Sequence, residues 1–563
     1  MVDEFILGIC AFTHDSSATL LRGRELVGFL EEDRLSGLKH TNAFPELAIA
    51  ALLRSAGIGR GEVGAVAYPF DSTLYELGRA AANRRPGPLE RRARGVASYD
   101  RISDQHRRSL ARLRDSFPRA AVVEVPHHNA HAYSAVAPAG WRSADVLVID
   151  SIGEAVTTSI GRWDRVTKSL NLIPRGFDTD SVGYLYGAVT DHLGFRMRDE
   201  EGTVMALAAG GDPRRFRTLF SRILKIDTCG IRLDPQYVHQ RVFGDSGNRL
   251  TSLFTHQTVG RRAAADPIQA VHADLAAALQ ERTGQVFESL CANSTASLRA
   301  ISGGVATNCV AVGQLRQRWP DVEFFVPPAP GDSGTSLGAA VGCLLERHGE
   351  LASIPAHPYW GPTPEPPQIA TLLSAGLRFE NMPTAALASE CARRIAGGEI
   401  IGVYRGPAEA GPRALGHRSI LADPRVEGIH HRLALRVKKR ELFRPFAPIT
   451  RLSQADEFVE LGRYGTPYMS AALRARDKLC ELAPVVVHTN GTTRMQTVEV
   501  GQDQFIEQVI DEFERLTGSP ILINTSLNPK GSPTVGTRID GLACLMDMEL
   551  DALVLDNDLV TKI

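Results

Sequence analysis

Two histidines four residues apart, and a carboxylate that ends an apolar run, are the side chains of this sequence best suited to bind a metal. His127 and His131 stand at helical spacing, which places both imidazoles on one face of a helix. The run from Asp145 predicts a buried strand that ends at Asp150, and α/β sheets place ligands at that carboxyl end. Two imidazoles and a carboxylate suit a divalent transition metal. A pair of core or helix-capping histidines is the alternative interpretation.

Glycine-rich loops follow three of the segments that we predict to be strands. Their sequences are Asp150-Ser-Ile-Gly153, Ser302-Gly-Gly304 and Gly331-Asp-Ser-Gly334. Glycines in such loops let backbone N–H groups approach phosphate oxygens, and the amino terminus of a following helix favours negative charge. One such loop is weak evidence, because strand–helix turns often contain glycine for steric reasons. Three together predict a site for a nucleotide and a cation, formed by Ser151, Gly153, Gly303, Gly304 and Asn308.

The carboxy-terminal part of the chain combines basic side chains with amide and hydroxyl groups. The five segments are Gly411-Pro-Arg-Ala-Leu-Gly416, Lys438-Lys-Arg-Glu441, Phe443-Arg-Pro-Phe446, Thr489-Asn-Gly-Thr-Thr-Arg494 and Asn524-Thr-Ser-Leu-Asn528. These residue types bind phosphate or carbamoyl oxygens. Each basic residue alone would more often form a surface salt bridge. Their occurrence within one small domain favours an anion-binding pocket.

The composition is that of a globular enzyme with more than one domain. The chain has 563 residues, of which 43% are hydrophobic and 23% charged, with a net charge of -1. This charge gives no general attraction for nucleic acid or an anionic membrane, and no apolar run approaches the roughly 20 residues of a membrane span. The acidic amino terminus argues against a secretory signal, and the eight cysteines include no Cys-x-x-Cys pair. We expect a cytoplasmic protein that has no membrane or nucleic-acid partner.

Arginines are frequent between Gly78 and Pro118, and they include Arg84-Arg85 and Arg91-Arg92-Ala-Arg94. Nucleic-acid binding is one interpretation of such a run. Aromatic residues are nearly absent from this stretch, however, and the whole chain is balanced in charge. These features favour a solvated helical face.

Helices and strands on both sides of a linker must position the residues named above. Apolar residues from Phe5 to Phe12 predict a first strand, and 298–301 predict another. The periodicity of residues 44–56 and 271–290 predicts helices. Between Ser353 and Pro367 six prolines occur with few apolar residues, which is typical of a linker. The predicted domains are therefore residues 1–352 and 369–563, joined by residues 353–368.

Ten short motifs are spread over nearly the whole chain. They are His14-Asp-Ser-Ser-Ala18, Glu31-Glu-Asp-Arg34, Lys39-His40, His127-His-Asn-Ala-His131, Ser302-Gly-Gly-Val-Ala306 with Asn308, Gly331-Asp-Ser-Gly334, Gly411-Pro-Arg-Ala-Leu-Gly416, Phe443-Arg-Pro-Phe-Ala-Pro448, Gly491-Thr-Thr-Arg494 and Asn524-Thr-Ser526. In the identity and order of these motifs the chain resembles the antibiotic O-carbamoyltransferases. That family includes the nebramycin, cephalosporin and nodulation-factor carbamoyltransferases.

The resemblance implies a fold and a reaction. The fold is α/β, with an actin/Hsp70-like ATPase domain of the type shared with tRNA threonylcarbamoyl transferases, followed by a YrdC-like domain. The YrdC-like domain would convert carbamoyl phosphate and ATP, with Mg²⁺, to carbamoyl-adenylate. The adenylate would then move to the metal site of the first domain. There, a hydroxyl of a small-molecule acceptor, such as a glycoside or a macrolide, would attack it.

The resemblance also implies roles for individual residues. His14 would be the general base, and Lys39 would contact the acceptor. The metal would be iron(II) or another divalent transition metal, held by His127, His131, Asp150 and Asp332. Carbamoyl phosphate and the phosphates of ATP would be bound by Arg413, Lys438, Arg444, Arg494, Asn524 and Ser526.

Two positions depart from the pattern of that family. The family segment Gly-Lys-Val-Met-Gly-Leu-Ala is Gly202-Thr-Val-Met-Ala-Leu-Ala208 here, so Thr203 replaces a lysine on the acceptor side. In the segment Asn528-Pro-Lys-Gly-Ser532, Ser532 replaces a glutamate that is common in the family. The first change removes a cation that could contact the acceptor, and the second alters the expected phosphate contacts.

Two other functions compete with small-molecule carbamoylation. An enzyme that carbamoylates threonine on tRNA would share the first domain, but the neutral charge and the second domain with Phe443-Arg-Pro-Phe446 argue against it. A non-catalytic ATP-dependent switch of the Hsp70 type would leave His127, His131 and the second domain unexplained. The sequence leaves open the acceptor, the native metal and the oligomeric state, a homodimer included.

Overall fold

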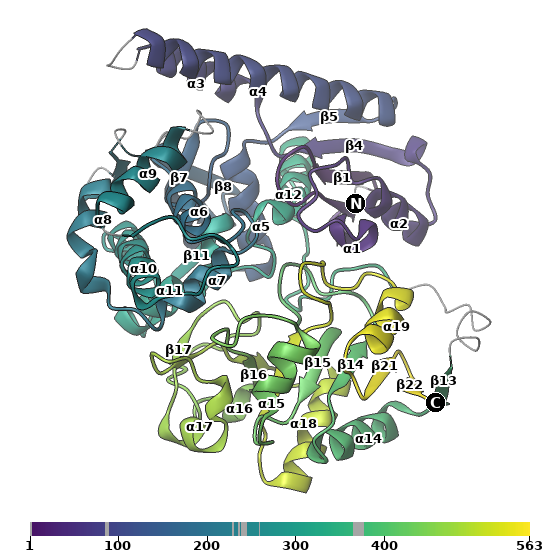
Figure 1. The fold of residues 1–563 in the computed structure, drawn as a ribbon. Coiled ribbons are helices and arrows are strands. Elements are labelled where there is room, and N and C mark those ends of the chain that lie inside the picture. The colour runs from purple at the N-terminus through teal and green to yellow at the C-terminus, as the bar shows by residue number, and fades with distance from the viewer. Residues whose placement is uncertain are drawn as a thin grey trace. The chain divides into compact units, whose positions relative to one another are not determined.

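The protein is described here by a computed structural model that covers residues 3–84, 89–178, 180–227, 230–234, 237, 245–257, 259–363 and 376–563. The chain divides into two compact units, which are drawn in Figure 1. Unit 1 consists of residues 1–29 and 42–356, and unit 2 consists of residues 30–41 and 357–563. Residues 30–41, expected in the first domain, therefore pack with the second. Of the predicted linker, residues 364–368 lie outside the described residues.

Unit 1 contains two five-stranded sheets that share one strand order. The first sheet, in the order β3-β2-β1-β4-β5, consists of β1 (Phe5–Cys10), β2 (Ser17–Arg22), β3 (Glu25–Glu31), β4 (Val63–Tyr68) and β5 (Ala121–Glu124). The second, in the order β12-β11-β6-β7-β8, consists of β6 (Ser143–Ile149), β7 (Val156–Asp164), β8 (Ser169–Phe177), β11 (Leu298–Ser302) and β12 (Glu323–Phe325). In each sheet the first strand in the sequence pairs antiparallel with the second and parallel with the fourth, and the fourth pairs parallel with the fifth. One topology thus occurs twice in this unit.

Helices α5 (His127–Ala139) and α12 (Thr335–His348) of unit 1 pack on each other, and each also contacts one of the two sheets. Helix α12 contacts β1, β2 and β4, and α5 contacts β6 and β11. The two helix backbones approach closely, because a Cβ atom at Gly338 would lie only 1.7 Å from the carbonyl oxygen of Ala130. A Cβ atom at Gly8 would similarly lie 1.9 Å from the carbonyl oxygen of Ser336. Glycine at these two positions therefore allows α12 to contact both β1 and α5.

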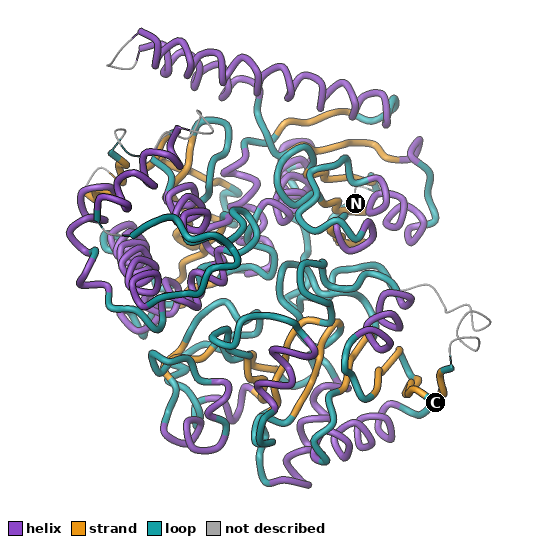
Figure 2. Tube along the Cα trace, viewed as in Figure 1, coloured by secondary structure: helices purple, strands orange, loops and turns teal. Residues whose placement is uncertain are grey.

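The remaining elements of unit 1 are mainly helices, shown in Figure 2 by secondary structure. They are α2 (Glu46–Ala56), α3 (Ser72–Arg84), α4 (Leu89–Ser116), α6 (Val182–His192), α7 (Glu201–Ala208), α8 (Arg217–Ile223), α9 (Asp245–His256), α10 (Ala270–Cys291) and α11 (Cys309–Arg318), with the hairpin β9 (Leu224–Asp227) and β10 (Gly230–Leu233). Of the arginine-rich segment, residues 78–84 belong to α3 and residues 89–116 form α4, and these two helices lie side by side, whereas residues 85–88 lie outside the described residues. Among the described residues, no helix is long and apolar enough to span a membrane.

Unit 2 contains one mixed eight-stranded sheet, in the order β13-β22-β21-β14-β15-β20-β16-β19. Its strands are β13 (Leu377–Asn381), β14 (Ile401–Tyr404), β15 (Arg418–Ala422), β16 (Ala447–Arg451), β19 (Gln496–Val498), β20 (Leu522–Ser526), β21 (Ala552–Leu555) and β22 (Asp558–Lys562), and a second, small sheet pairs β17 (Leu473–Arg474) with β18 (Thr492–Thr493). Its helices are α1 (Asp33–Ser36), α14 (Thr384–Ala396), α15 (Ile429–His431), α16 (Leu452–Ala455), α17 (Asp477–Leu482), α18 (Gln504–Thr517) and α19 (Arg538–Asp547). Both units are therefore of the mixed α/β class that the sequence predicts.

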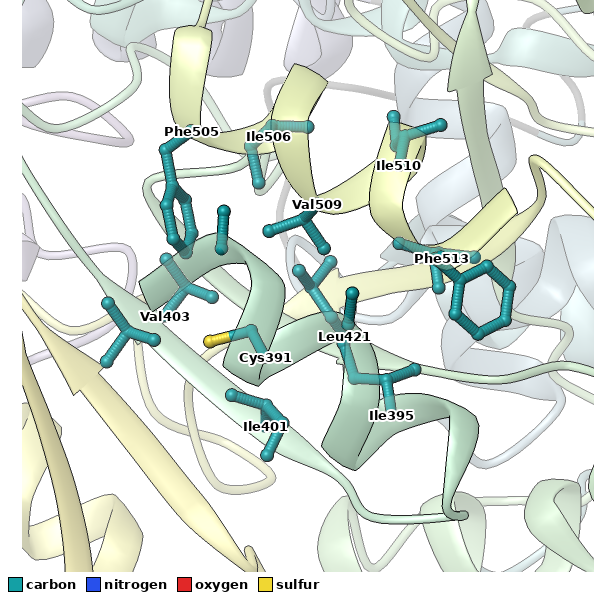
Figure 3. Packing of buried hydrophobic residues seen from close by; sticks show 14 of the residues in the cluster. Cys391, Ile395, Ile401, Val403, Leu421, Phe505, Ile506, Val509, Ile510 and Phe513 are labelled. Atoms are coloured by element: carbon teal, nitrogen blue, oxygen red, sulfur yellow. The ribbon is translucent and has the colours of Figure 1, made fainter. Parts of the chain in front are cut away.

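The core of unit 2 lies between two helices and the large sheet. Helix α18 has a strongly apolar face, and its Val509 and Phe513 point toward α14 (Figure 3). Cys391 of α14 packs in the same cluster with Ile401 of β14. All four side chains are at most 1% exposed. Burial of these apolar side chains holds α14 and α18 against the large sheet. The sheet can therefore support the polar loops that follow its strands.

A candidate metal centre and a candidate anion site

Four side chains of unit 1 form a group that could bind a metal. One imidazole nitrogen or carboxylate oxygen of each lies within 4.8 Å of the others, in His127, His131, Asp150 and Asp332. The Nε2 atom of His127 lies 3.1 Å from Nε2 of His131, 3.4 Å from Oδ2 of Asp150 and 3.7 Å from Oδ1 of Asp332. The Nε2 atom of His131 lies 3.6 Å from the same oxygen of Asp332. The structure thus brings together the four residues predicted to hold a metal.

These four residues lie at or near the start of α5, the end of β6 and the turn before α12. His127 is the first residue of α5 and His131 follows one turn later, so both rings project from one helix face. Asp150 directly follows β6, and Asp332 begins the short turn before α12. Because α5 and α12 are in close contact, Asp332 lies beside the two histidines.

Neighbouring groups orient the ligand atoms. The Nδ1 atom of His127 lies 3.1 Å from the carbonyl oxygen of Pro69, which can only accept a hydrogen bond. In the neutral ring Nδ1 therefore carries the proton, and the lone pair of Nε2 is available to a metal. The backbone N–H of Gly304 donates to Oδ1 of Asp150 at 3.0 Å, so Oδ2 faces the histidines. This arrangement resembles a metal site in which outer contacts hold each ligand in place.

Strong electrostatic coupling accompanies the burial of this group. Burial disfavours the charged form of His127, but Asp150 and Asp332 outweigh it and raise the pKa of His127 well above its ordinary value. Burial also acts to raise the pKa of Asp332, whereas the nearby imidazoles of His127 and His131, 3.7 and 3.6 Å away, hold that pKa well below its usual range. The opposite directions of these pKa shifts favour ionised carboxylates beside a protonated imidazole. A divalent cation can replace that proton, and two imidazoles with two carboxylates fit a transition metal.

Basic side chains of unit 2 gather around Lys438, which follows a π-helical turn over Arg432–Val437. The Lys438 ammonium is buried, and it donates to the carbonyl oxygen of Ser526 and to Oδ1 of Asn528, each at 2.7 Å. Both of these acceptors are neutral. Burial, together with the charges of Arg440 and Arg444, lowers the pKa of Lys438 well below its ordinary value. These two hydrogen-bond partners therefore bring no negative charge to the lysine.

Arg440 and Arg494 add two further guanidinium groups to the surroundings of Lys438. The Arg440 guanidinium lies 4.2 Å from the centre of the Phe446 ring, and burial with the charges of Arg444 and Arg494 lowers the pKa of Arg440 well below its ordinary value. The Nε atoms of Arg440 and Arg494 are buried and have no hydrogen-bond partner among the described residues. Excess positive charge and unused N–H donors fit an anionic ligand.

Asn524 extends this group toward the loop that contains Arg413. The Nδ2 atom of Asn524 donates to the carbonyl oxygen of Ala414 at 3.1 Å and to Oε1 of Gln496 at 2.6 Å. Its Oδ1 atom is buried without a partner in the described part of the chain. Asn524 lies on β20, which also ends in Ser526, so the end of one strand supplies two of the predicted ligand-binding residues.

Comparison with known sequences decides the family. The family model described as "Carbamoyltransferase N-terminus" matches residues 95–341, and the one described as "Carbamoyltransferase C-terminus" matches residues 392–562. The chain is 33% identical to Nodulation protein NolNO of Sinorhizobium fredii, over 98% of this chain and 79% of that protein. It is 35% identical to Nodulation protein NolO of Bradyrhizobium diazoefficiens, over 77% of this chain and 78% of that protein. The chain belongs to the carbamoyltransferase family. It is therefore an enzyme, as the sequence predicts.

Solved structures resemble this carbamoyltransferase only weakly. Component A of (R)-2-hydroxyglutaryl-CoA dehydratase from Acidaminococcus fermentans matches with a TM-score of 0.33 and 14% identity, over 60% of this chain and 96% of that chain. HypF from T. kodakarensis matches with a TM-score of 0.31 and 14% identity, over 62% of this chain and 49% of that chain. Scores in this range assign no fold family.

His14 of the carbamoyltransferase lies in a turn next to the metal-ligand group, since the neighbouring Thr13 donates to Asp332 at 2.9 Å. The Nδ1 atom of His14 lies 2.7 Å from Oδ2 of Asp15, and its Nε2 atom lies 2.8 Å from the carbonyl oxygen of Arg198. Both partners can accept hydrogen bonds, so both ring nitrogens of His14 are engaged. To act as a base, His14 must first separate from Arg198.

The glycines predicted to contact a nucleotide pack against the metal-ligand group. Gly303 has a φ of 99°, and a Cβ atom there would lie 2.2 Å from the carbonyl oxygen of Ile149. A Cβ atom at Gly153 would lie 3.2 Å from Cβ of His127. Glycine is required at Gly303 by conformation and by space. Close packing around the ligands is thus a second reason for these glycines, beside contact with phosphate.

The other two predicted nucleotide residues differ in their surroundings. Ser151 faces α6, where a Cβ atom at Gly183 would lie 2.7 Å from its Oγ atom. Asn308 caps α11 by accepting from the backbone N–H of Ala311 at 3.0 Å. Its amide also pairs with that of Gln280, with both N–H···O contacts at 3.0 Å. Asn308 therefore has a structural role that the sequence pattern did not indicate.

Lys39, predicted to contact the acceptor, belongs to unit 2 rather than to the unit of the metal-ligand group. It is close enough to Lys438 for its charge to lower the pKa of that lysine.

Sequence reasoning also missed Arg440 and Asn528 as site residues, although both stand in motifs that it singled out. Thr203 and Ser532 are the two positions at which the sequence departs from the family pattern. Thr203 is buried in α7, and the carbonyl oxygen of Ser532 accepts a hydrogen bond from Nδ2 of Asn528 at 2.6 Å.

Proposed function

We propose that this enzyme is an ATP-dependent O-carbamoyltransferase that acts on a hydroxyl of a small molecule, such as a glycoside or a macrolide, in the cytoplasm. The observation that carries the proposal is the presence of two chemically different groups of residues, one in each unit. The basic group around Lys438 suits phosphate-bearing substrates, and the group of two histidines and two aspartates suits a metal. We further propose that unit 1 is an actin/Hsp70-like domain, which its duplicated strand order supports, and that unit 2 is YrdC-like.

The first half-reaction is assigned to unit 2. Carbamoyl phosphate and water give carbamate and phosphate, and a carbamate oxygen then attacks the α-phosphorus of ATP. Pyrophosphate leaves, and carbamoyl-adenylate forms. Arg413, Lys438, Arg444, Arg494, Asn524 and Ser526 would hold the phosphate and carbamoyl oxygens. Carbamate is short-lived in water, so its use within one enclosed site limits its loss.

The second half-reaction is assigned to unit 1. The oxygen of the acceptor hydroxyl attacks the carbamoyl carbon, AMP leaves, and the hydroxyl proton passes to a base, for which we propose His14. Ser151, Gly153, Gly303 and Gly304 would contact the adenylate. His127, His131, Asp150 and Asp332 would hold iron(II) or another divalent metal, whose charge would offset that of the leaving phosphate.

A direct test is product analysis with the whole enzyme. The enzyme would be incubated with carbamoyl phosphate, ATP, Mg²⁺ and a panel of sugar, macrolide and β-lactam alcohols, and the products analysed by mass spectrometry. We expect a carbamoyl addition to at least one alcohol, and formation of AMP and pyrophosphate. Carbamoylation that proceeds without ATP would contradict the proposed route.

Substitution of His14 tests its role as the base. His14→Asn keeps a hydrogen-bonding group but loses the basic nitrogen, so transfer from supplied carbamoyl-adenylate should slow by roughly 10²–10⁴-fold. The loss should appear in the rate of transfer and not in the binding of carbamoyl-adenylate, because a base acts only on the chemical step. Metal content and adenylate formation should survive. A variant that transfers within a few-fold of wild type would show that His14 only bonds Asp15 and Arg198.

Anion binding at Lys438 should be coupled to proton uptake. The pKa of Lys438 is lowered in the free enzyme, and a bound anion favours the charged ammonium, so binding raises that pKa. Calorimetry with sulfate, which does not itself titrate near neutral pH, would measure this in buffers of different ionisation enthalpy. We expect a buffer-dependent enthalpy with the sign of proton uptake, and weaker binding as pH rises. Lys438→Met should lose the buffer dependence, and an equal enthalpy in all buffers for wild type would contradict the expectation.

A further inference from the structure

The segment 30–41 interrupts unit 1 in the sequence but belongs to unit 2. It contains the motif Glu31-Glu-Asp-Arg34, to which the proposed reaction gives no role. The segment is in close backbone contact with the rest of unit 2, because a Cβ atom at Gly536 would lie 1.9 Å from the carbonyl oxygen of Arg34. An amino-terminal segment thus forms part of the unit that carries the basic group.

Arg34 links this segment to the loop of Arg413. Its side chain is 3% exposed, and its Nε atom donates to Oε2 of Glu31 at 2.8 Å. Its Nη2 atom donates to the carbonyl oxygen of Gly411 at 2.6 Å. Gly411 has a φ of 87° and begins the loop, two residues before Arg413. A guanidinium in a fixed pair with a carboxylate is a rigid support for that carbonyl group.

Glu409 holds the other end of the same loop. It is 2% exposed, and its Oε1 atom accepts from the backbone N–H groups of Leu415, His417 and Arg418 at 2.8, 3.0 and 2.9 Å. Arg34 is near enough to act on this carboxylate, since its charge helps to lower the pKa of Glu409 against the effect of burial. The loop is therefore held at its start by Arg34 and at its end by Glu409.

We propose that Arg34 is a positioning residue for Arg413 in the unit 2 reaction. With Glu409, it holds the loop 411–417 in one conformation, so that the Arg413 guanidinium needs no ordering when carbamoyl phosphate binds. The geometry thus gives the Glu31-Glu-Asp-Arg34 motif a role in the phosphate site rather than in the acceptor site. The inference rests on the proposed function, because it takes Arg413 as a ligand of carbamoyl phosphate.

The test compares Arg34→Ala with wild type in the full chain, by following carbamoyl-adenylate formation at varied carbamoyl phosphate. A displaced loop should raise the KM for carbamoyl phosphate by about 10²-fold, since a shift of 1 Å in a positioned group costs a factor of that order. Added guanidinium should partly restore the KM. Transfer from supplied carbamoyl-adenylate in unit 1 should be unchanged. If the alanine variant does not fold, Arg34→Lys serves instead, because it keeps the charge but loses the planar fork.

Arg262→Ala is the matched control, because Arg262 of unit 1 is also buried, at 7% exposure, and its Nε atom donates to the carbonyl oxygen of Leu193 at 2.6 Å. This variant should lower the Tm without raising the KM for carbamoyl phosphate. An Arg34→Ala enzyme with unchanged KM, whatever its Tm or active fraction, would overturn the positioning role. A wild-type enzyme that forms no carbamoyl-adenylate would overturn the proposed function, and the inference with it.

Discussion

The His131→Ala and Asp150→Asn variants should contain almost no transition metal, whereas the wild-type enzyme should contain about one metal per chain. Loss of the His131 ring or of the Asp150 charge leaves three of the four ligands intact, and in His131→Ala the carboxylates of Asp150 and Asp332 face a single imidazole. Carbamoyl transfer in unit 1 should therefore fall to background. Elemental analysis of the purified protein and transfer from supplied carbamoyl-adenylate measure the two effects. Adenylate formation in unit 2 should continue.

His128→Asn is a suitable control for these variants. His128 lies on the same helix and is buried, but its Nδ1 atom contacts Oγ of Ser159 at 2.8 Å, and it is not part of the metal-ligand group. Asparagine can keep the contact to Ser159, so metal content and transfer should stay within a few-fold of wild type. Wild-type enzyme that remains fully active after its metal has been removed by chelation would show that the group is not a catalytic metal site.

Loss of Arg444 should stop carbamoyl-adenylate formation while leaving its use intact. Arg444 is partly buried, and its charge acts on both Lys438 and Arg440, so it belongs to the basic group of unit 2. Removal of one positioned donor to a reacting oxyanion typically costs about 10²–10³-fold in rate. Arg444→Ala should show a loss of this size in the formation of carbamoyl-adenylate from carbamoyl phosphate and ATP. Supplied carbamoyl-adenylate should be transferred at the wild-type rate.

Arg436→Ala provides the comparison for Arg444→Ala. Arg436 lies in the turn just before Lys438, but its side chain is 69% exposed and pairs with Glu549 at 3.6 Å. An exposed pair of this kind contributes little to stability, so both half-reactions should be unaffected. If Arg444→Ala forms carbamoyl-adenylate as fast as wild type, the assignment of the two half-reactions to the two units is wrong.

Local patterns in the sequence predicted much of the secondary structure and three of the four residues of the metal-ligand group. The periodicity of residues 44–56 and 271–290 predicted helices, and the structure confirms them as α2 and α10. The spacing of His127 and His131 is a property of one helix, and Asp150 follows one strand. Such features depend on backbone geometry within a single element, which repeats at a fixed period. The motifs also identified the family before any comparison.

Contacts between distant elements were decided only by the tertiary structure. Asp332 reaches the histidines because Gly338 lets α12 approach α5, and no local pattern contains that contact. Arg34 precedes its partner Gly411 by 377 residues, and residues 30–41 belong to unit 2 although the chain on both sides of them belongs to unit 1. The spacing of residues along one element follows from its own backbone, whereas the meeting of two elements depends on how all their surfaces pack. For that reason the sequence determined the chemistry available to this enzyme, and the packing determined which residues act together.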